Sequence, residues 1–192
     1  LMRKVRKESA VAKAQFLSKG SKSGKKYSFD LRIHSPGTDG YFSTGGVEAA
    51  SALVRLAKAK GLDLIAVTDF YNTEYIEAVR EAAAKAKVIV LPGFDICCQI
   101  GECKEVFFTT LFPQETPVSA LVETLRALGV PEGAEGARGL VLEQPVAEVL
   151  QIIESRGGML IPSRIDKNPY RQLAIRELVE VHGFRTFDLV HP

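Results

Sequence analysis

From residue 26 onward, segments with the apolar pattern of strands alternate with segments that have the apolar pattern of helices. Short apolar runs, as expected for strands, occur at 27–33, 62–67, 88–91, 94–98, 105–112, 159–162 and 187–190. Segments with apolar residues at helical spacing occur at 47–60, 73–85, 116–128, 145–156 and 170–182, with a glycine-rich loop at 131–139. This order predicts a parallel sheet covered by helices. About six strands are expected, fewer than a closed eight-stranded barrel needs.

The composition is that of a globular domain. The 192 residues fit one domain, and 46% of them are hydrophobic and 25% charged, as in ordinary soluble proteins. No apolar run approaches the ~20 residues that span a bilayer, and the N-terminus lacks the apolar stretch of a signal peptide. We therefore expect a cytoplasmic protein without a membrane partner. Cys97, Cys98 and Cys103 are expected to be buried thiols on strands, with a metal site as the alternative.

The net charge of +2 conceals an uneven distribution. Residues 1–26 carry nine Lys and Arg residues and one acid, a charge of +8, which leaves −6 on the rest of the chain. We therefore divide the chain into a basic flexible arm or linker at 1–26 and an α/β domain at 27–192. The arm is either a solvated linker or a contact for nucleic acid or another anionic surface.

Polar residues follow the predicted strands at four places where an active site would form. In folds of parallel strands, functional groups gather at the carboxyl ends of the strands. The four positions are 32–34 together with Asp39, 68–70, 92–95 and 163–166. We therefore expect a site rim rich in carboxylates at this edge of the sheet.

Five motifs follow one another in order along the chain. They are Phe29-Asp-Leu-Arg-Ile-His-Ser35 with Thr38-Asp39-Gly40, Gly61-Leu-Asp-Leu-Ile-Ala-Val-Thr-Asp-Phe70, Leu91-Pro-Gly-Phe-Asp-Ile96, Glu105-Val-Phe107 and Gly157-Gly-Met-Leu-Ile-Pro-Ser-Arg-Ile-Asp166. The series resembles the motifs of the polymerase and histidinol phosphatase (PHP) superfamily of metal-dependent phosphoesterases. That resemblance implies a distorted TIM-like (β/α) barrel with parallel strands. The family's terminal D-x-H motif would lie beyond Pro192, which leaves open that the barrel is incomplete at its C-terminal end.

The departures from the family pattern fall on the metal ligands. Four family histidines are replaced, in chain order by Arg32, Phe70, Phe107 and Arg164. Arginine and phenylalanine offer no lone pair to a metal ion. We therefore expect no metal. If one binds, the resemblance assigns it to His34, Asp39 and Asp95, with Mn, Fe, Zn or Mg as the candidates.

Three interpretations of this pocket remain open. In the first, Arg32 and Arg164 neutralise buried carboxylates of a pseudoenzyme, drawn from Asp39, Asp69, Asp95 and Asp166. In the second, the two arginines bind an anion such as phosphate. In the third, one residual metal supports hydrolysis by activating water. The expected rim of the site comprises Asp69, Phe70, Phe107 and Asp166.

The function predicted from these residues is a PHP-like domain that has lost catalysis and serves as an interaction or anion-sensing module. The alternative is an active metal-dependent phosphoesterase with a reduced metal site. The expected partners are other domains of a larger protein and a phosphate-bearing ligand. Nucleic acid is a further partner only if the basic arm contacts it.

Overall fold

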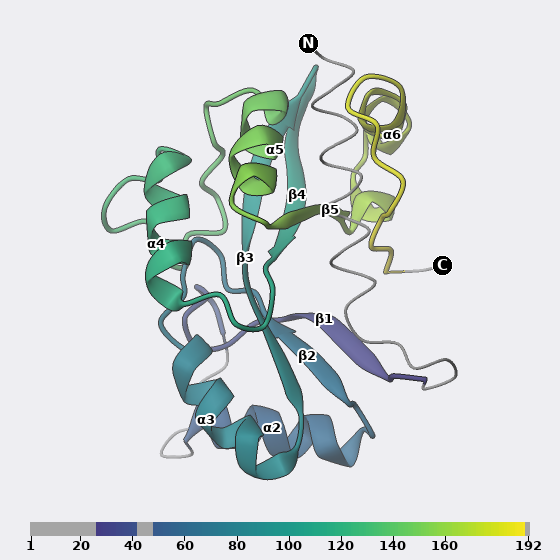
Figure 1. Cartoon of the computed structure of the whole chain (residues 1–192). Coiled ribbons are helices and arrows are strands. Elements are labelled where there is room, and N and C mark those ends of the chain that lie inside the picture. Colours follow the sequence, from purple (N-terminus) through teal and green to yellow (C-terminus); the bar gives the residue numbers. More distant parts are fainter. Residues whose placement is uncertain (1–25, 42–47, 191–192) are drawn as a thin grey trace.

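Five strands form one sheet in the computed structural model, which describes residues 26–41 and 48–190. The strands lie in the order β1-β2-β3-β4-β5, and helices connect all consecutive strands except β3 and β4 (Figure 1). Their bounds are Phe29–Ile33 for β1, Leu64–Val67 for β2, Ile89–Ile100 for β3, Cys103–Leu111 for β4 and Met159–Ser163 for β5. The basic arm predicted at 1–26 lies outside the described residues, apart from Lys26.

The long strand β3 belongs to both halves of the sheet. Its first residues, from Ile89 to Pro92, pair in parallel with β2. From Gly93 onward it pairs antiparallel with β4. The change of partner requires a glycine, because a Cβ atom at Gly93 would lie 2.1 Å from the carbonyl oxygen of Thr110. The sequence predicts two strands separated at Pro92-Gly93. This prediction is wrong, because one strand continues through both residues.

The prediction of an all-parallel sheet is wrong for β4, which runs antiparallel to both β3 and β5. Only a two-residue turn, Gly101 and Glu102, separates β3 from β4. A turn of this length permits an antiparallel hairpin, whereas a parallel return needs a crossover of a dozen or more residues. Gly101 has a φ of 52°, a conformation that glycine adopts without strain.

The five predicted helices are all present, and each contains fewer residues than predicted. Their bounds are Ala49–Ala59 for α2, Ile76–Ala86 for α3, Val118–Ala127 for α4, Val146–Ser155 for α5 and Arg171–Glu180 for α6. Helices α2 and α3 lie beside β1 and β2, α4 and α5 beside β3 and β4, and α6 beside the distal part of the hairpin (Figure 1). The run 187–190, expected to be a strand, forms none, although the Asp188 amide donates to the Pro162 carbonyl at 2.9 Å.

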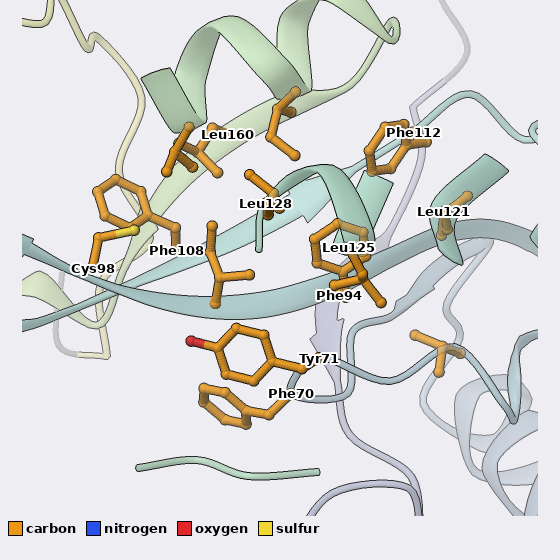
Figure 2. Close-up of a cluster of buried hydrophobic side chains, with 14 of the residues drawn as sticks. Phe70, Tyr71, Phe94, Cys98, Phe108, Phe112, Leu121, Leu125, Leu128 and Leu160 are labelled. Atoms are coloured by element: carbon orange, nitrogen blue, oxygen red, sulfur yellow. The ribbon is translucent and has the colours of Figure 1, made fainter. Parts of the chain in front are cut away.

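Large apolar side chains from the sheet and the helices fill a common core. Phe94 of β3, Phe108 of β4 and Leu121 of α4 are fully buried within it, and Figure 2 shows this cluster. Cys97, Cys98 and Cys103 are buried free thiols on β3 and β4, which confirms their structural interpretation. Because burial disfavours a thiolate, it raises the pKa of Cys97 to about 12.

The described residues thus form an α/β fold with an open sheet that curls like half of a barrel. Its first three strands are parallel, and β1 and β2 end beside the middle of the longer β3, where Asp95 lies. None of the helices that the structure describes is long and apolar enough to cross a membrane.

Candidate functional site

A buried carboxylate, Asp95, lies at the centre of the candidate site. It sits in the middle of β3 rather than at the end of a strand, and none of its surface is exposed. Arg32, on β1, places its Nη2 2.7 Å from Asp95 Oδ2. His34 follows the same strand and places its Nε2 2.9 Å from the same oxygen. Two side chains from the first motif therefore converge on one carboxylate oxygen.

The second oxygen of Asp95 accepts a hydrogen bond from a hydroxyl group on the neighbouring strand. Thr109 pairs with Asp95 in the β3–β4 ladder, and its Oγ1 donates to Asp95 Oδ1 at 2.8 Å. Ser163, at the end of β5, lies 2.7 Å from the same Thr109 hydroxyl. The Ser163 hydroxyl also lies within donating distance of the Ile161 carbonyl, at 3.2 Å. The carboxylate is thus fully engaged by protein groups.

A second buried carboxylate, Asp69, follows β2 and is also satisfied locally. Ser35 donates to it through both its amide, at 2.6 Å, and its hydroxyl group. The Thr38 hydroxyl donates to Asp69 Oδ1 at 2.7 Å. Hydrogen bonds of this kind stabilise a buried carboxylate without a metal ion or a counter-charge.

Aromatic rings occupy two positions where the PHP motifs have histidines. Phe70 is completely buried, with its ring centroid 5.3 Å from that of His34 and 5.6 Å from that of Phe107. The guanidinium of Arg138, an exposed residue, lies over the Phe70 ring at 5.6 Å from its centroid, in cation–π range. These rings fill space beside Asp95 and supply no ligand atom.

The glycine-rich loop at 131–139 closes the site from outside. The Gly136 amide donates to the Phe70 carbonyl at 2.7 Å, and the Gly136 carbonyl accepts from the Asp39 amide at 3.0 Å. A Cβ atom at Gly136 would lie 2.8 Å from the Gly37 carbonyl oxygen, so the close approach requires glycine. Tyr71 secures the end of the loop, because its hydroxyl donates to the Leu140 carbonyl at 2.6 Å.

The residues present do not fit the metal centre that the fold family implies. His34 and Asp95 are in contact, but the Arg32 guanidinium binds the same carboxylate oxygen that a metal ion would need. Asp39, the third candidate ligand, is an exposed residue. Within residues 26–41 and 48–190, no group of three His, Cys, Asp or Glu side chains is arranged to hold a metal ion.

Arg164 lies in a cavity beside the end of β5, at the edge of this site, because Phe107 and Ser163 also line the cavity. It has a φ of 53°, in the left-handed region, and its carbonyl accepts from the Lys167 amide at the start of the short 3-10 helix η1, Ile165–Lys167. The cavity has a volume of about 490 Å³, and Lys104 and Lys167 also line it. No ion pair joins Arg164 to any carboxylate in the described part of the chain.

The structure brings together Arg32, His34, Phe70, Asp95 and Phe107. Arg164, which was expected in the same pocket as Arg32, makes no ion pair with Asp95. The structure does not bring Asp166 to this group, because Asp166 Oδ1 accepts from the Val190 amide at 3.0 Å on another side. The sequence analysis included Ser163 among the polar residues at strand ends but missed the hydroxyl and guanidinium groups of Ser35, Thr38, Thr109 and Arg138. Ser35 and Thr38 lie within the recognised motifs and could have been found there. Thr109 depends on the cross-strand register, which no local pattern reveals.

The fold is similar to the folds of solved hydrolase structures. An amidohydrolase from Chromobacterium violaceum, solved with bound sulfate and no metal, has a TM-score of 0.61 at 15% identity, covering 83% of this chain and 76% of that chain. A proposed metal-dependent phosphoesterase from Bifidobacterium adolescentis has a TM-score of 0.58 at 14% identity, covering 85% and 77%.

A two-domain protein from Bacteroides vulgatus has a similar fold. It contains a predicted PHP-like metal-dependent phosphoesterase, with a TM-score of 0.53 at 14% identity over 84% of this chain and 43% of that chain. Likenesses at this identity establish the fold and not the activity. The chain has the fold of PHP-like phosphoesterases, which confirms at the level of fold the resemblance seen in the five motifs. No protein-family model and no curated protein matches the chain.

Proposed function

We propose that this chain is a PHP-like domain without metal-dependent catalysis that binds a phosphate-bearing anion at Arg164. The observation that carries the first part is the engagement of Asp95. Arg32 and His34 bind one of its oxygens at 2.7 and 2.9 Å, and Thr109 binds the other at 2.8 Å. A hydrolytic metal centre would have to displace these groups before it could form.

Charge balance supports this interpretation. A carboxylate buried at 0% exposure needs a counter-charge or several donors, and Arg32 provides the positive charge without a metal ion. The guanidinium cannot be deprotonated in a protein, so it repels a divalent cation at every ordinary pH. Phe70 and Phe107 fill the adjoining volume with apolar rings. Together the replacements stabilise the site in a metal-free form.

Arg164 supports the second part of the proposal. A left-handed backbone costs a residue with a side chain about 1–2 kcal/mol, which glycine would avoid. Arg164 accepts this conformation and lines a cavity, yet it pairs with no described carboxylate. A guanidinium fork matches the oxygens of a phosphate group. The Chromobacterium violaceum structure, with its bound sulfate and no metal, gives a precedent for an anion in this fold.

The second candidate function is an active metal-dependent phosphoesterase with a reduced site. The direct contact of His34 with Asp95 favours it, since these are two of the three ligands that the motifs assign. The names of similar structures, which include metal-dependent phosphoesterases, favour it as well. The two candidates differ in whether the purified protein holds a metal ion.

Metal analysis separates the two candidates. Protein incubated with Mn²⁺ or Zn²⁺, then desalted, is expected to retain far less than one metal ion per chain and to leave 4-nitrophenyl phosphate intact. Stoichiometric metal that is lost in His34→Ala, together with metal-dependent hydrolysis, would replace the proposed function with the phosphoesterase.

Anion binding is tested by a pair of glycine substitutions. Arg164→Gly relieves the left-handed strain and removes the guanidinium, so the protein should remain folded and lose inorganic phosphate binding in calorimetric titrations. Lys87→Gly is the matched control, because exposed Lys87 also has a left-handed φ, 57°, at the end of α3. Both variants lose one positive charge, so equal phosphate binding by the two would contradict a specific role for Arg164.

A further inference from the structure

The cavity around Arg164 has an apolar side as well as a charged side. Phe107 is half-buried there, and Tyr170 lines the same cavity while remaining 58% exposed. The buried side chains of Val106 and Ile165 complete the lining. A volume of about 490 Å³ is within the range of sites that take small organic ligands, roughly 300–1,000 Å³. The cavity is therefore larger than an inorganic anion requires.

The backbone beside Tyr170 is fixed although its ring is exposed. Its amide donates to Asn168 Oδ1 at 2.8 Å, and Asn168 Nδ2 in turn donates to the Glu105 carbonyl at 2.7 Å. The Cys103 thiol approaches the Tyr170 carbonyl at 3.5 Å. These contacts tie the residue to the β3–β4 hairpin. Tyr170 takes part in none of the ring–ring contacts among the described residues, so its aromatic faces are free to stack.

The charges around the cavity favour a small anion over a polyanion. Arg164, Lys104 and Lys167 are cationic, whereas Glu102 and Glu105 are anionic, which leaves a single net positive charge on the lining. Nucleic acid is held by grooves in which several cationic side chains follow the phosphate backbone. Two carboxylates in the lining would repel such a backbone. A ligand with a single anionic group can approach Arg164 without meeting them.

We infer that the cavity binds a small aromatic phosphate monoester, with its phosphate on Arg164 and its ring against Tyr170. This inference rests on the proposed function and adds the aromatic part of the ligand. Stacking of a planar ring on an aromatic side chain contributes about 1–3 kcal/mol, which corresponds to roughly a 5- to 150-fold increase in affinity. The phosphate supplies the attraction to Arg164, and the ring determines selectivity.

The test compares phenyl phosphate with methyl phosphate, which carries the same charge and lacks the ring. In calorimetric titrations of the full chain, phenyl phosphate should bind at least roughly tenfold more tightly. Tyr170→Ala should reduce that ratio to about threefold or less, whereas Tyr170→Phe should preserve it. Leu173→Ala, which alters a 57% exposed side chain of α6 that does not line the cavity, is the control and should change nothing.

The outcomes distinguish this inference from the function on which it rests. Equal affinities for phenyl and methyl phosphate, both lost in Arg164→Gly, would overturn the aromatic ligand and leave the anion site standing. A preference for phenyl phosphate that persists in Tyr170→Ala would also overturn it. Failure of every phosphate to bind would overturn both proposals.

Discussion

Replacement of Arg32 by methionine tests whether the ion pair at the centre of the site stabilises the metal-free fold. The two charges lie 2.7 Å apart, and at an effective dielectric constant of about 20 their attraction is about 6 kcal/mol. Desolvation offsets part of this attraction, although the Arg32 side chain is still 17% exposed. Breaking a buried pair typically costs about 3–5 kcal/mol, because the remaining charge is left without a partner.

His34 and Thr109 still bind Asp95 in the Arg32→Met variant, so we expect a loss near the lower limit, about 3 kcal/mol. For a chain of this length, this loss lowers the midpoint of thermal unfolding by about 6–12 °C. Urea denaturation followed by circular dichroism measures the free energy of unfolding. Adding Asp95→Asn removes the unpaired charge and should recover more than half of the loss.

Arg176→Met is the control for this experiment. Arg176 pairs with Glu180 at 3.0 Å, but its side chain is 74% exposed. An exposed pair one helical turn apart contributes less than about 0.5 kcal/mol. If Arg32→Met destabilises the protein no more than Arg176→Met does, the argument that Arg32 replaces a metal ion as the counter-charge of Asp95 is refuted.

Three further predictions follow from other parts of the structure. Gly93→Ala should destabilise the protein by about 3 kcal/mol or more, because the new Cβ would lie 2.1 Å from the Thr110 carbonyl oxygen. Gly139→Ala is the control and should leave the free energy of unfolding unchanged in the same urea titration, because a Cβ atom there would have no neighbour within 4 Å. Ser35→Ala should cost about 1–3 kcal/mol, since buried Asp69 loses a hydroxyl donor; an unchanged unfolding midpoint would contradict this. Burial raises the pKa of Cys97 to about 12, whereas an unfolded thiol titrates near 8.5. The folded state therefore keeps a proton that the unfolded state loses, and stability should fall as pH rises above about 8.5, less steeply in Cys97→Ala.

The positions of the strands, and the polar residues that follow them, could be predicted from the sequence, because local patterns of apolar residues define strands and helices. Arg32, His34 and Asp95 meet as the motifs predicted. The direction of β4 was missed, although the short gap between the apolar runs at 94–98 and 105–112 permits only a hairpin. Contacts that depend on cross-strand register, such as that of Thr109 with Asp95, could not be deduced from neighbouring residues.

The replacements at the family's ligand positions act on one another, so no single one explains the site. A buried Asp95 without a metal ion requires a counter-charge, and Arg32 supplies it from a position where the PHP motifs have a histidine. Because the Arg32 guanidinium repels a metal ion, metal ligands at the neighbouring positions would have nothing to bind. Phe70 and Phe107 occupy these positions and add apolar packing. Restoring one histidine would therefore not restore a metal centre, because it would remove the counter-charge and return only one of the missing ligands. Arg164 differs from this group, since it neutralises no described carboxylate and faces a cavity with room for a ligand. In the metal-free form that we propose, protein groups occupy the centre of the site, and Arg164 at its edge has no described carboxylate as a partner.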